Sequence, residues 1–396
     1  MRRGLIIQMT KWLSSGLGQM AGYLIVILAG LLVVSCSDHD DGVGNGSASS
    51  SAKPISFSSG SMQTRATSKT SIERSDNFYI LAFDHLTQDL YIGFSSGTGT
   101  GLTYSGIELR HFNDDLWAPV DLRTLYWPGG ALDFCAYYPN GATISHNSSR
   151  EMVYTASNAI ADQKDILYAY KGNVMATDDD ITENTFIDAD NFSFLTKTVT
   201  LNFKHALSQV GFTASVGQNW DVTIKSITIH NVYSAGTFDY STATWTNTGT
   251  PNNAIPFTLA TPEVFNGVSA SRELKANAAG TEVLILMPQT LNNPWVPSST
   301  NPISATATSL QSYVDIECKI MNRSNSSYYA GTASAYGHVY APIDGMWEAG
   351  KKYSYEIAFG AGYKDTGEAT IQFLTLSAKI TDWVEGNTYT GQAEFD

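Results

Sequence analysis

Apolar and polar residues alternate along most of this chain, and this two-residue period constrains the fold more than any other feature of the sequence. Val199, Leu201 and Phe203 alternate with polar neighbours, and the pattern recurs over 210–216, 314–320 and 353–359. Because successive side chains of a β-strand point to opposite faces, these segments are expected to be half-buried strands. Beyond the amino-terminal stretch, no run of about 12 residues carries apolar side chains at helical spacing. The sequence therefore predicts an all-β fold.

Two of the expected strands change phase within their length. The alternation slips between Ile224 and Ile227 in VTIKSITI, and between Phe373 and Leu374 in IQFLTL. One extra residue in a strand moves every following side chain to the other face, as happens at a β-bulge. We therefore expect a bulge at each position.

The 396-residue chain is too long for a leader and a single sandwich. Residues 1–35 have the pattern of a signal peptide, and 36–53 are Ser, Gly, Asp and Ala with few apolar side chains, as in a flexible tether. Strand patterns begin at Pro54. We predict two β-sandwiches, one over 54–196 and one over 197–396, with a boundary near residue 196, give or take about ten residues.

The amino terminus resembles a bacterial lipoprotein leader. Arg2, Arg3 and Lys11 precede the apolar run GYLIVILAGLLVV, which Ser35 and Cys36 follow directly. The run is shorter than the roughly 20 residues that a membrane-spanning helix needs, although a spanning helix extended towards Gly18 remains an alternative. Acylation of the Cys36 thiol would anchor the exported chain to a membrane. The acidic run that follows resembles a signal for the outer face of the outer membrane, or is a solvated linker.

Charge and cysteine content exclude several classes of protein. The chain carries 23 Lys and Arg against 37 Asp and Glu, a net charge of −14, which disfavours binding to nucleic acid. Besides Cys36, it has only Cys135 and Cys318, one in each expected sandwich. Both are expected to be unpaired core residues rather than a disulfide.

No motif for catalysis, a metal or a cofactor is found. The seven histidines lack H-E-x-x-H spacing, and neither G-x-S-x-G nor G-x-x-x-x-G-K-[ST] occurs. The acidic groups at 178–180 and 188–190 lack the order of a preformed Ca²⁺ loop, so a solvated loop is the expected reading. Asp114 and Asp115 are interpreted as turn residues rather than as half of a glycosidase pair.

Aromatic residues gather between Trp117 and Tyr138. Exposed rings of this kind stack on sugars, so Trp117 and Trp127 are candidate glycan contacts. At strand spacing, however, aromatic side chains more often pack in the core. The sequence is compatible with glycan contact and with core packing of these two tryptophans.

An ordered set of motifs resembles the fimbrillin family of Bacteroidales, lipoprotein precursors of fimbrial subunits, over about residues 24–385. The motifs are the lipobox at Cys36, then ISF at 55–57, TRAT at 64–67, LYWP at 125–128, DFCAYYP at 133–139, DILY at 165–168, LNFKHALSQV at 201–210 and GTF at 236–238 before Trp245.

This resemblance implies a pair of transthyretin-like β-sandwiches and a structural role without catalysis or cofactors. The chain would be a fimbrial subunit, or a tip or accessory adhesin, on the cell surface and in biofilms. Its partners would be other fimbrial subunits, a host or bacterial surface receptor, and the outer membrane through the lipid anchor. The alternative function is a surface glycan-binding lipoprotein, and a hydrolase comes third.

The family pattern also implies proteolytic trimming and strand exchange. Arg65 matches the arginine of the family's T-R-A block, so Arg65–Ala66 is the candidate cleavage site and Pro54–Ser58 the strand released. Arg74 is the second candidate, and an ordinary exposed turn at Arg65 remains the alternative. The donor segment would come from Ile371–Val384 with the tail Gly386–Asp396, or this segment is an ordinary last strand. The polar tail favours a tip or accessory subunit.

Overall fold

The computed structural model describes residues 53–60, 72–112, 116–187, 193–267, 269–276, 283–291, 311–359 and 374–383. Within these ranges the regular structure is β-strand, apart from the short 3-10 helices η1 (Gly99–Gly101) and η2 (Ile160–Asp162). The all-β prediction is confirmed. In the same ranges, no helix has both the length and the apolar character needed to cross a bilayer.

The first sheet curls around a core of its own. Its described strands run in the order β13 (Thr182–Ile187), β14 (Ser193–Leu201), β1 (Pro54–Ser59), β7 (Leu116–Pro119), β6 (Ile107–His111), β2 (Asn77–Asp84), β9 (Leu132–Tyr138), β12 (Leu167–Val174) and β15 (Lys204–His205), with β3 (Leu90–Ile92) on β2 and β8 (Leu125–Tyr126) on β1. Phe57, Phe78, Leu109, Phe134 and Val199 share its enclosed core.

A second sheet packs on the outer face of the first. Its described strands are β19 (Thr244–Thr248), β18 (Ala235–Asp239), β11 (Met152–Thr155), β10 (Ser145–His146), β5 (Thr103–Ser105) and β4 (Phe94–Ser96). Cys135 and Tyr137 of β9 join Met152 and Phe238 of this sheet in a separate apolar cluster. Both faces of β9 are thus covered, and all seven of its residues are buried.

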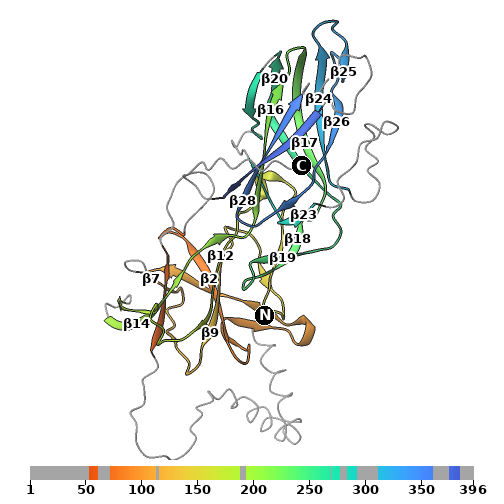
Figure 1. Ribbon diagram of the computed structural model, residues 1–396. Helices are drawn as coiled ribbons and strands as arrows, with labels where there is room; N and C mark the ends of the chain where they lie inside the picture. Colours follow the sequence, from red (N-terminus) through yellow and green to blue (C-terminus); the bar gives the residue numbers. More distant parts are fainter. Residues whose placement is uncertain are drawn as a thin grey trace, which may run out of the picture. The chain divides into compact units, whose positions relative to one another are not determined.

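Two further sheets form a sandwich in the carboxyl-terminal half (Figure 1). One contains β21 (Ser269–Glu273), β16 (Ser208–Val216), β28 (Lys351–Phe359), β29 (Leu374–Asp382) and β22 (Val283–Leu286), and the other β20 (Asn253–Asn266), β17 (Trp220–Val232), β24 (Tyr313–Asn322), β25 (Tyr328–Ala330) and β26 (Gly337–Pro342). Phe212, Phe257, Ile316 and Ile357 meet between them. The strands β23 (Gln289–Thr290) and β27 (Met346–Trp347) pair separately.

The long strand β20 forms an edge of this sandwich. Among the described residues it pairs with β17 and adds a single bridge between Leu259 and Ala276. Pro256 and Pro262 both lie in β20. Since proline has no backbone N–H, each removes one donor from the strand.

The strand β17 contains the bulge expected from its phase slip. Its register with both neighbours shifts between Ile224 and Ser226. This prediction is confirmed: against β24, Lys225 is the extra residue, whereas against β20 the additional residues lie in β20. The second predicted bulge involves Phe373, which lies outside the described residues.

Strand pairing indicates where the amino-terminal half ends and the carboxyl-terminal half begins. The predicted boundary near residue 196 falls inside β14, which pairs with β13 and β1, and β15 still pairs with β12. The hairpin of β18 and β19 then returns to pair with β11. We propose a boundary after His205, within the margin of the prediction, with this hairpin assigned to the amino-terminal half.

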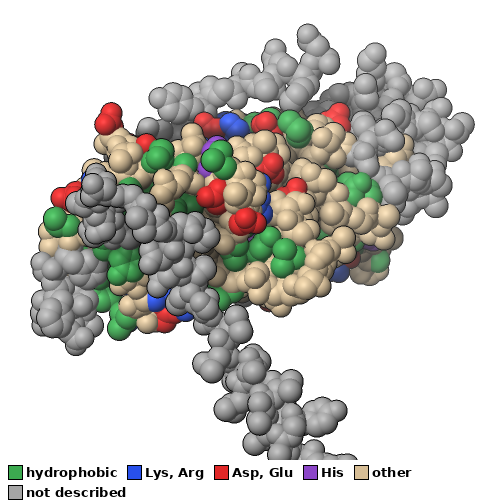
Figure 2. Space-filling model, turned by 90° about the horizontal axis from the view of Figure 1, so that it is seen from below, with side chains coloured by type: hydrophobic (Ala, Val, Ile, Leu, Met, Phe, Trp, Pro, Cys, Tyr) green, Lys and Arg blue, Asp and Glu red, His purple; other side chains and the backbone are tan. Residues whose placement is uncertain are grey.

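The two described cysteines are free and buried, as predicted. Cys135 is 5% exposed and Cys318 is fully enclosed, and burial raises the pKa of both thiols. The surface has few charged side chains: Figure 2 shows mostly uncharged atoms, with acidic, basic and hydrophobic side chains in small groups.

Candidate functional site

The strand β1 lies inside the first sheet although it comes from the start of the described chain. It pairs in parallel with β14 on one side and antiparallel with β7 and β8 on the other. Its partner residues Lys197–Leu201 are about 140 positions away, as the hydrogen bond between Ser56 and Thr196 illustrates. A short terminal strand thus fills a place between two strands of the later chain.

The two faces of β1 are held in different ways. Ile55 and Phe57 point into the core, where the Phe57 ring lies 5.8 Å from that of Phe134 in an edge-to-face contact. On the opposite face, the Ser56 hydroxyl lies 2.8 Å from the hydroxyls of both Thr196 and Thr198. The attachment of β1 therefore consists of two apolar side chains, a row of hydroxyls and backbone pairing.

Removal of β1 would leave a groove with a defined chemistry. The facing edges of β14 and β7 would lose the partners of their N–H and C=O groups, and two apolar pockets would open where Ile55 and Phe57 now lie. Exposed edges of this kind accept an extended segment whose alternate side chains fill the pockets. The groove therefore fits another strand with apolar residues two positions apart.

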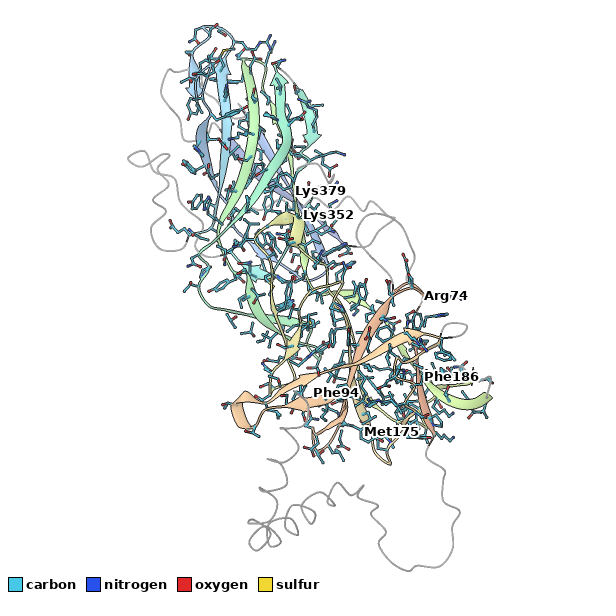
Figure 3. All side chains as sticks on the ribbon, turned by 180° about the vertical axis from the view of Figure 1, so that it is seen from behind. Arg74, Phe94, Met175, Phe186, Lys352 and Lys379 are labelled. Carbon is cyan, nitrogen blue, oxygen red and sulfur yellow. The ribbon has the colours of Figure 1, made fainter. Side chains whose placement is uncertain are left out.

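The last described strand, β29, forms an edge of the carboxyl-terminal sandwich. It pairs antiparallel with β28, and its half-buried residues Leu376, Ala378 and Ile380 pack against the core. Lys351 of β28 forms an ion pair with Asp382 at the end of β29. In Figure 3, Lys352 and Lys379 mark these two neighbouring strands. The segment Ile371–Val384 is thus a strand over its described part.

Trp383, directly after β29, stacks on a buried histidine. The ring centres of Trp383 and His205 lie 3.8 Å apart with an interplanar angle of 5°, and the backbone N–H of Trp383 donates to the Gly350 carbonyl at 2.7 Å. His205 Nδ1 lies 2.9 Å from Asp165 Oδ2, and burial raises the pKa of the Asp165 carboxyl although the hydrogen bond from His205 opposes this shift. This stack fixes the end of β29 to the region of β15.

Replacing Trp383 by alanine is expected to loosen β29 without unfolding the molecule. Amide hydrogen exchange in β29 should accelerate about 5-fold or more, because a stacked aromatic pair contributes roughly 1 kcal/mol beyond the area it buries. The matched control is Lys379→Ala, whose exposed side chain lies on the same strand. Equal exchange rates in both variants would show that the stack does not hold β29.

The predicted processing residues fall in and beside the connection between β1 and β2. Cys36, Arg65 and Ala66 lie outside the described residues, and so does the tail 384–396. Arg74 is exposed and lies in the turn just before β2, as Figure 3 shows. Arg65 and Arg74 both follow β1 and precede β2, so cleavage after either would separate β1 from the rest of the chain.

The suggestion that Trp117 and Trp127 contact glycans is wrong. Trp117 is 2% exposed and Trp127 is 5% exposed. The Trp117 ring packs 5.9 Å from Phe78, and the Trp127 ring lies 5.7 Å from Phe134. Both indoles face the enclosed core of the first sheet, so neither ring is available to a sugar.

The acidic residues considered as metal ligands have local partners where the structure describes them. Asp178 Oδ2 accepts a hydrogen bond from the Met175 N–H at 2.8 Å, and Asp180 pairs with Lys171 at 2.7 Å. Within the described ranges, no three His, Cys, Asp or Glu side chains gather as a metal site. Asp114, Asp115 and 188–190 lie outside these ranges.

Two features of the structure were not predicted from the sequence. The His205–Trp383 stack joins residues 178 positions apart (383 − 205) and has no local signal. A polar cleft around Arg150 draws its lining from separate loops and strands, and its residues form no motif.

Comparison with known proteins gives one match in sequence and several in structure. The sequence model of the fimbrillin-like family matches residues 64–383, which begin after the end of β1 and stop at Trp383. Among curated proteins, none matches the chain.

A fimbrial protein from Bacteroides vulgatus aligns with 11% identity and a TM-score of 0.46, covering 78% of this chain and 92% of that one. The fimbrial anchor protein Mfa2 from Porphyromonas gingivalis aligns with 8% identity and a TM-score of 0.36, covering 84% and 98%.

Proposed function

Because this chain belongs to the fimbrillin-like family, we propose that it is a subunit of cell-surface fimbriae. The family prediction made from the sequence motifs is confirmed. We assign the chain a structural role, as a stalk, tip or accessory subunit, without catalysis. We further propose that its two halves are the pair of transthyretin-like sandwiches that the family resemblance implies.

The observation that carries this proposal is the position of β1. A terminal strand that pairs on both sides and fills two core pockets is separable from the domain in a way that an internal strand is not. The matched family region begins after β1, which supports its treatment as a removable segment. Cleavage after Arg65, with Arg74 as the second candidate, would release it.

We further propose that an extended segment of a neighbouring subunit replaces β1. The main candidate is the carboxyl-terminal segment, whose described part is β29 with Leu376, Ala378 and Ile380 two positions apart. This spacing matches the two pockets left by Ile55 and Phe57. Release of β29 for this purpose requires the Trp383–His205 stack to open, and the tail 384–396 is the alternative source of the donor.

The leader at residues 1–35 and the cysteine that follows it support a proposed route to the cell surface. We propose export as a lipoprotein, acylation at Cys36 and display on the outer membrane, with partners among other fimbrial subunits and a surface receptor. Mass spectrometry of the native amino terminus tests this route, because an acylated Cys36 and a free Ala66 correspond to the anchored and the processed forms.

Protein that begins at Ala66 is expected to form SDS-resistant ladders or filaments, whereas protein that begins at Ser37 stays monomeric. The physical reason is that only the trimmed protein has an open groove between β14 and β7. Electrophoresis without boiling and electron microscopy measure the difference.

A peptide of residues 53–60 provides the control. Added in excess to the trimmed protein, it should refill the groove and suppress the ladders, while a peptide with Ile55→Ser and Phe57→Ser should not. Identical monomers from both lengths of protein would contradict strand exchange.

A further inference from the structure

A polar cleft lies between the first and the second sheet. Its volume is about 450 Å³, and it is lined by side chains from five separate segments. They are Gln88 after β2, Asp133 of β9, Arg150 and Glu151 before β11, Tyr170 of β12, and Asp239 of β18. Both sheets therefore contribute polar groups to a single hollow.

Each carboxylate in the cleft is held in place through one oxygen atom. Asp133 Oδ1 accepts from the Asn173 N–H at 2.8 Å and lies 2.8 Å from His85 Nδ1. Asp239 Oδ1 accepts from the N–H and the hydroxyl of Ser241, both at 2.7 Å.

Glu151 follows the same pattern, since its Oε2 accepts from Asn147 Nδ2 at 2.8 Å. Among the described residues, no hydrogen bond reaches the second carboxylate oxygen of Asp133 or Glu151. The cleft thus has carboxylate oxygens that can still accept a hydrogen bond from a ligand.

Arg150 supplies the complementary donors. Its guanidinium carbon lies 5.3 Å from the centre of the Phe83 ring, and within the described part of the chain its N–H groups have no hydrogen-bond partner. The backbone of Arg150 has φ of +68°, a conformation uncommon for residues other than glycine and asparagine. The side chain is therefore placed over Phe83 by its turn and keeps its five donors available.

The mixture of groups selects a neutral ligand rich in hydroxyls. Three carboxylates disfavour an anion, and the Arg150 guanidinium among them offsets part of the negative charge that would hold a small cation. A hydroxyl can donate to a carboxylate oxygen and accept from a guanidinium N–H at the same time. The ring of Tyr170, which is 37% exposed, adds an aromatic face of the kind on which the C–H groups of a sugar pack.

We propose that this cleft binds one ring of a neutral saccharide, with Arg150 and Glu151 as hydrogen-bonding residues and Tyr170 as the stacking face. The site differs from the buried Trp117 and Trp127 and does not depend on fimbrial assembly. It gives the chain a specific means of attachment to a glycan-covered surface.

Saturation-transfer NMR with a panel of methyl glycosides tests the site in protein that begins at Ser37, which contains every described residue. The panel holds the glycosides of glucose, galactose, mannose, fucose and N-acetylglucosamine, each at about 10 mM, since single sugar rings bind at millimolar concentrations. N-acetylneuraminic acid and putrescine serve as the anionic and cationic comparisons. At least one neutral glycoside should bind, and both comparisons should bind more weakly.

Amino-acid substitutions then test which residues of the cleft contact the glycoside. Arg150→Asn keeps a residue that tolerates positive φ and should weaken binding about 10-fold or more, because it removes a charged donor. Tyr170→Leu should weaken it several-fold, whereas Tyr328→Leu, at a tyrosine of similar exposure in β25, should not. Absence of binding to every neutral glycoside overturns the proposal. So does binding that Arg150→Asn and Tyr170→Leu leave unchanged, or preferential binding of either charged compound.

Discussion

Replacing Phe57 by alanine is expected to lower the free energy of unfolding by about 3–5 kcal/mol, the usual cost of truncating a fully buried phenylalanine. Phe57 has no exposed surface, and its ring contacts Phe134 in the core of the first sheet. Since domains of ordinary stability unfold with about 5–15 kcal/mol, this loss is large enough to shift the urea midpoint clearly. Equilibrium unfolding in urea measures it.

Phe94→Ala is the matched control for this substitution. Phe94 is 48% exposed on the edge strand β4 and contacts the Arg123 guanidinium at 5.2 Å. Its replacement should cost about 1 kcal/mol or less. If Phe57→Ala were as mild as Phe94→Ala, β1 would not be an integral part of the folded monomer, and its release would not open a strand-accepting groove.

Acidification is expected to destabilise the protein through the buried His146. This residue is fully enclosed, and its Nε2 lies 2.9 Å from the Tyr240 hydroxyl. Burial lowers the pKa of His146 from the usual 6.5 to about 3.

Whether stability rises or falls with pH depends on which state, folded or unfolded, takes up the proton at the higher pH. Below pH 6.5 the unfolded chain protonates at His146 while the folded protein does not, so stability falls as the pH drops from 6.5 to about 3. Each pH unit in this window costs up to about 1.4 kcal/mol, and the whole window roughly 5 kcal/mol. Urea unfolding at pH 7, 5 and 4 measures the loss.

His146→Gln separates this effect from the titration of carboxylates. The variant keeps an amide that can reach Tyr240 but cannot take up the proton, so it should lose less stability than the parent between pH 6.5 and 4. His338→Gln is the control, because His338 has 48% of its side chain exposed beside Asp315. A parent and a His146→Gln variant with the same pH dependence would contradict the assignment.

The sequence predicted those strands whose two faces differ. In β24, in β28 and in β16 from Phe212 onward, one face is buried and the other is partly exposed, so the alternation of residues is visible. The strand β9 is covered on both sides, and its sequence LDFCAYY is apolar except for Asp133, so it shows no alternation that would tell which residue faces which layer. For the same reason the orientation of Trp117 and Trp127 could not be read from their spacing.

Pairing between strands that are far apart in the sequence could not be predicted from local residue patterns. The return of β18 and β19 to β11, and the parallel match of β1 with β14, depend on partners that lie far along the chain. Register is fixed by contacts across the sheet, and no local residue encodes it. The cleft around Arg150 has the same origin, because its polar groups meet only after the first two sheets have packed.

The prolines of β20 limit how copies of this protein can associate sideways. A fibre-forming protein with a bare fourteen-residue edge would fuse laterally into broad β-aggregates. Pro256 and Pro262 interrupt the row of donors along β20, so lateral fusion through this edge is disfavoured relative to growth by the proposed strand exchange. The expected product is a thin, unbranched thread rather than a sheet or a clump.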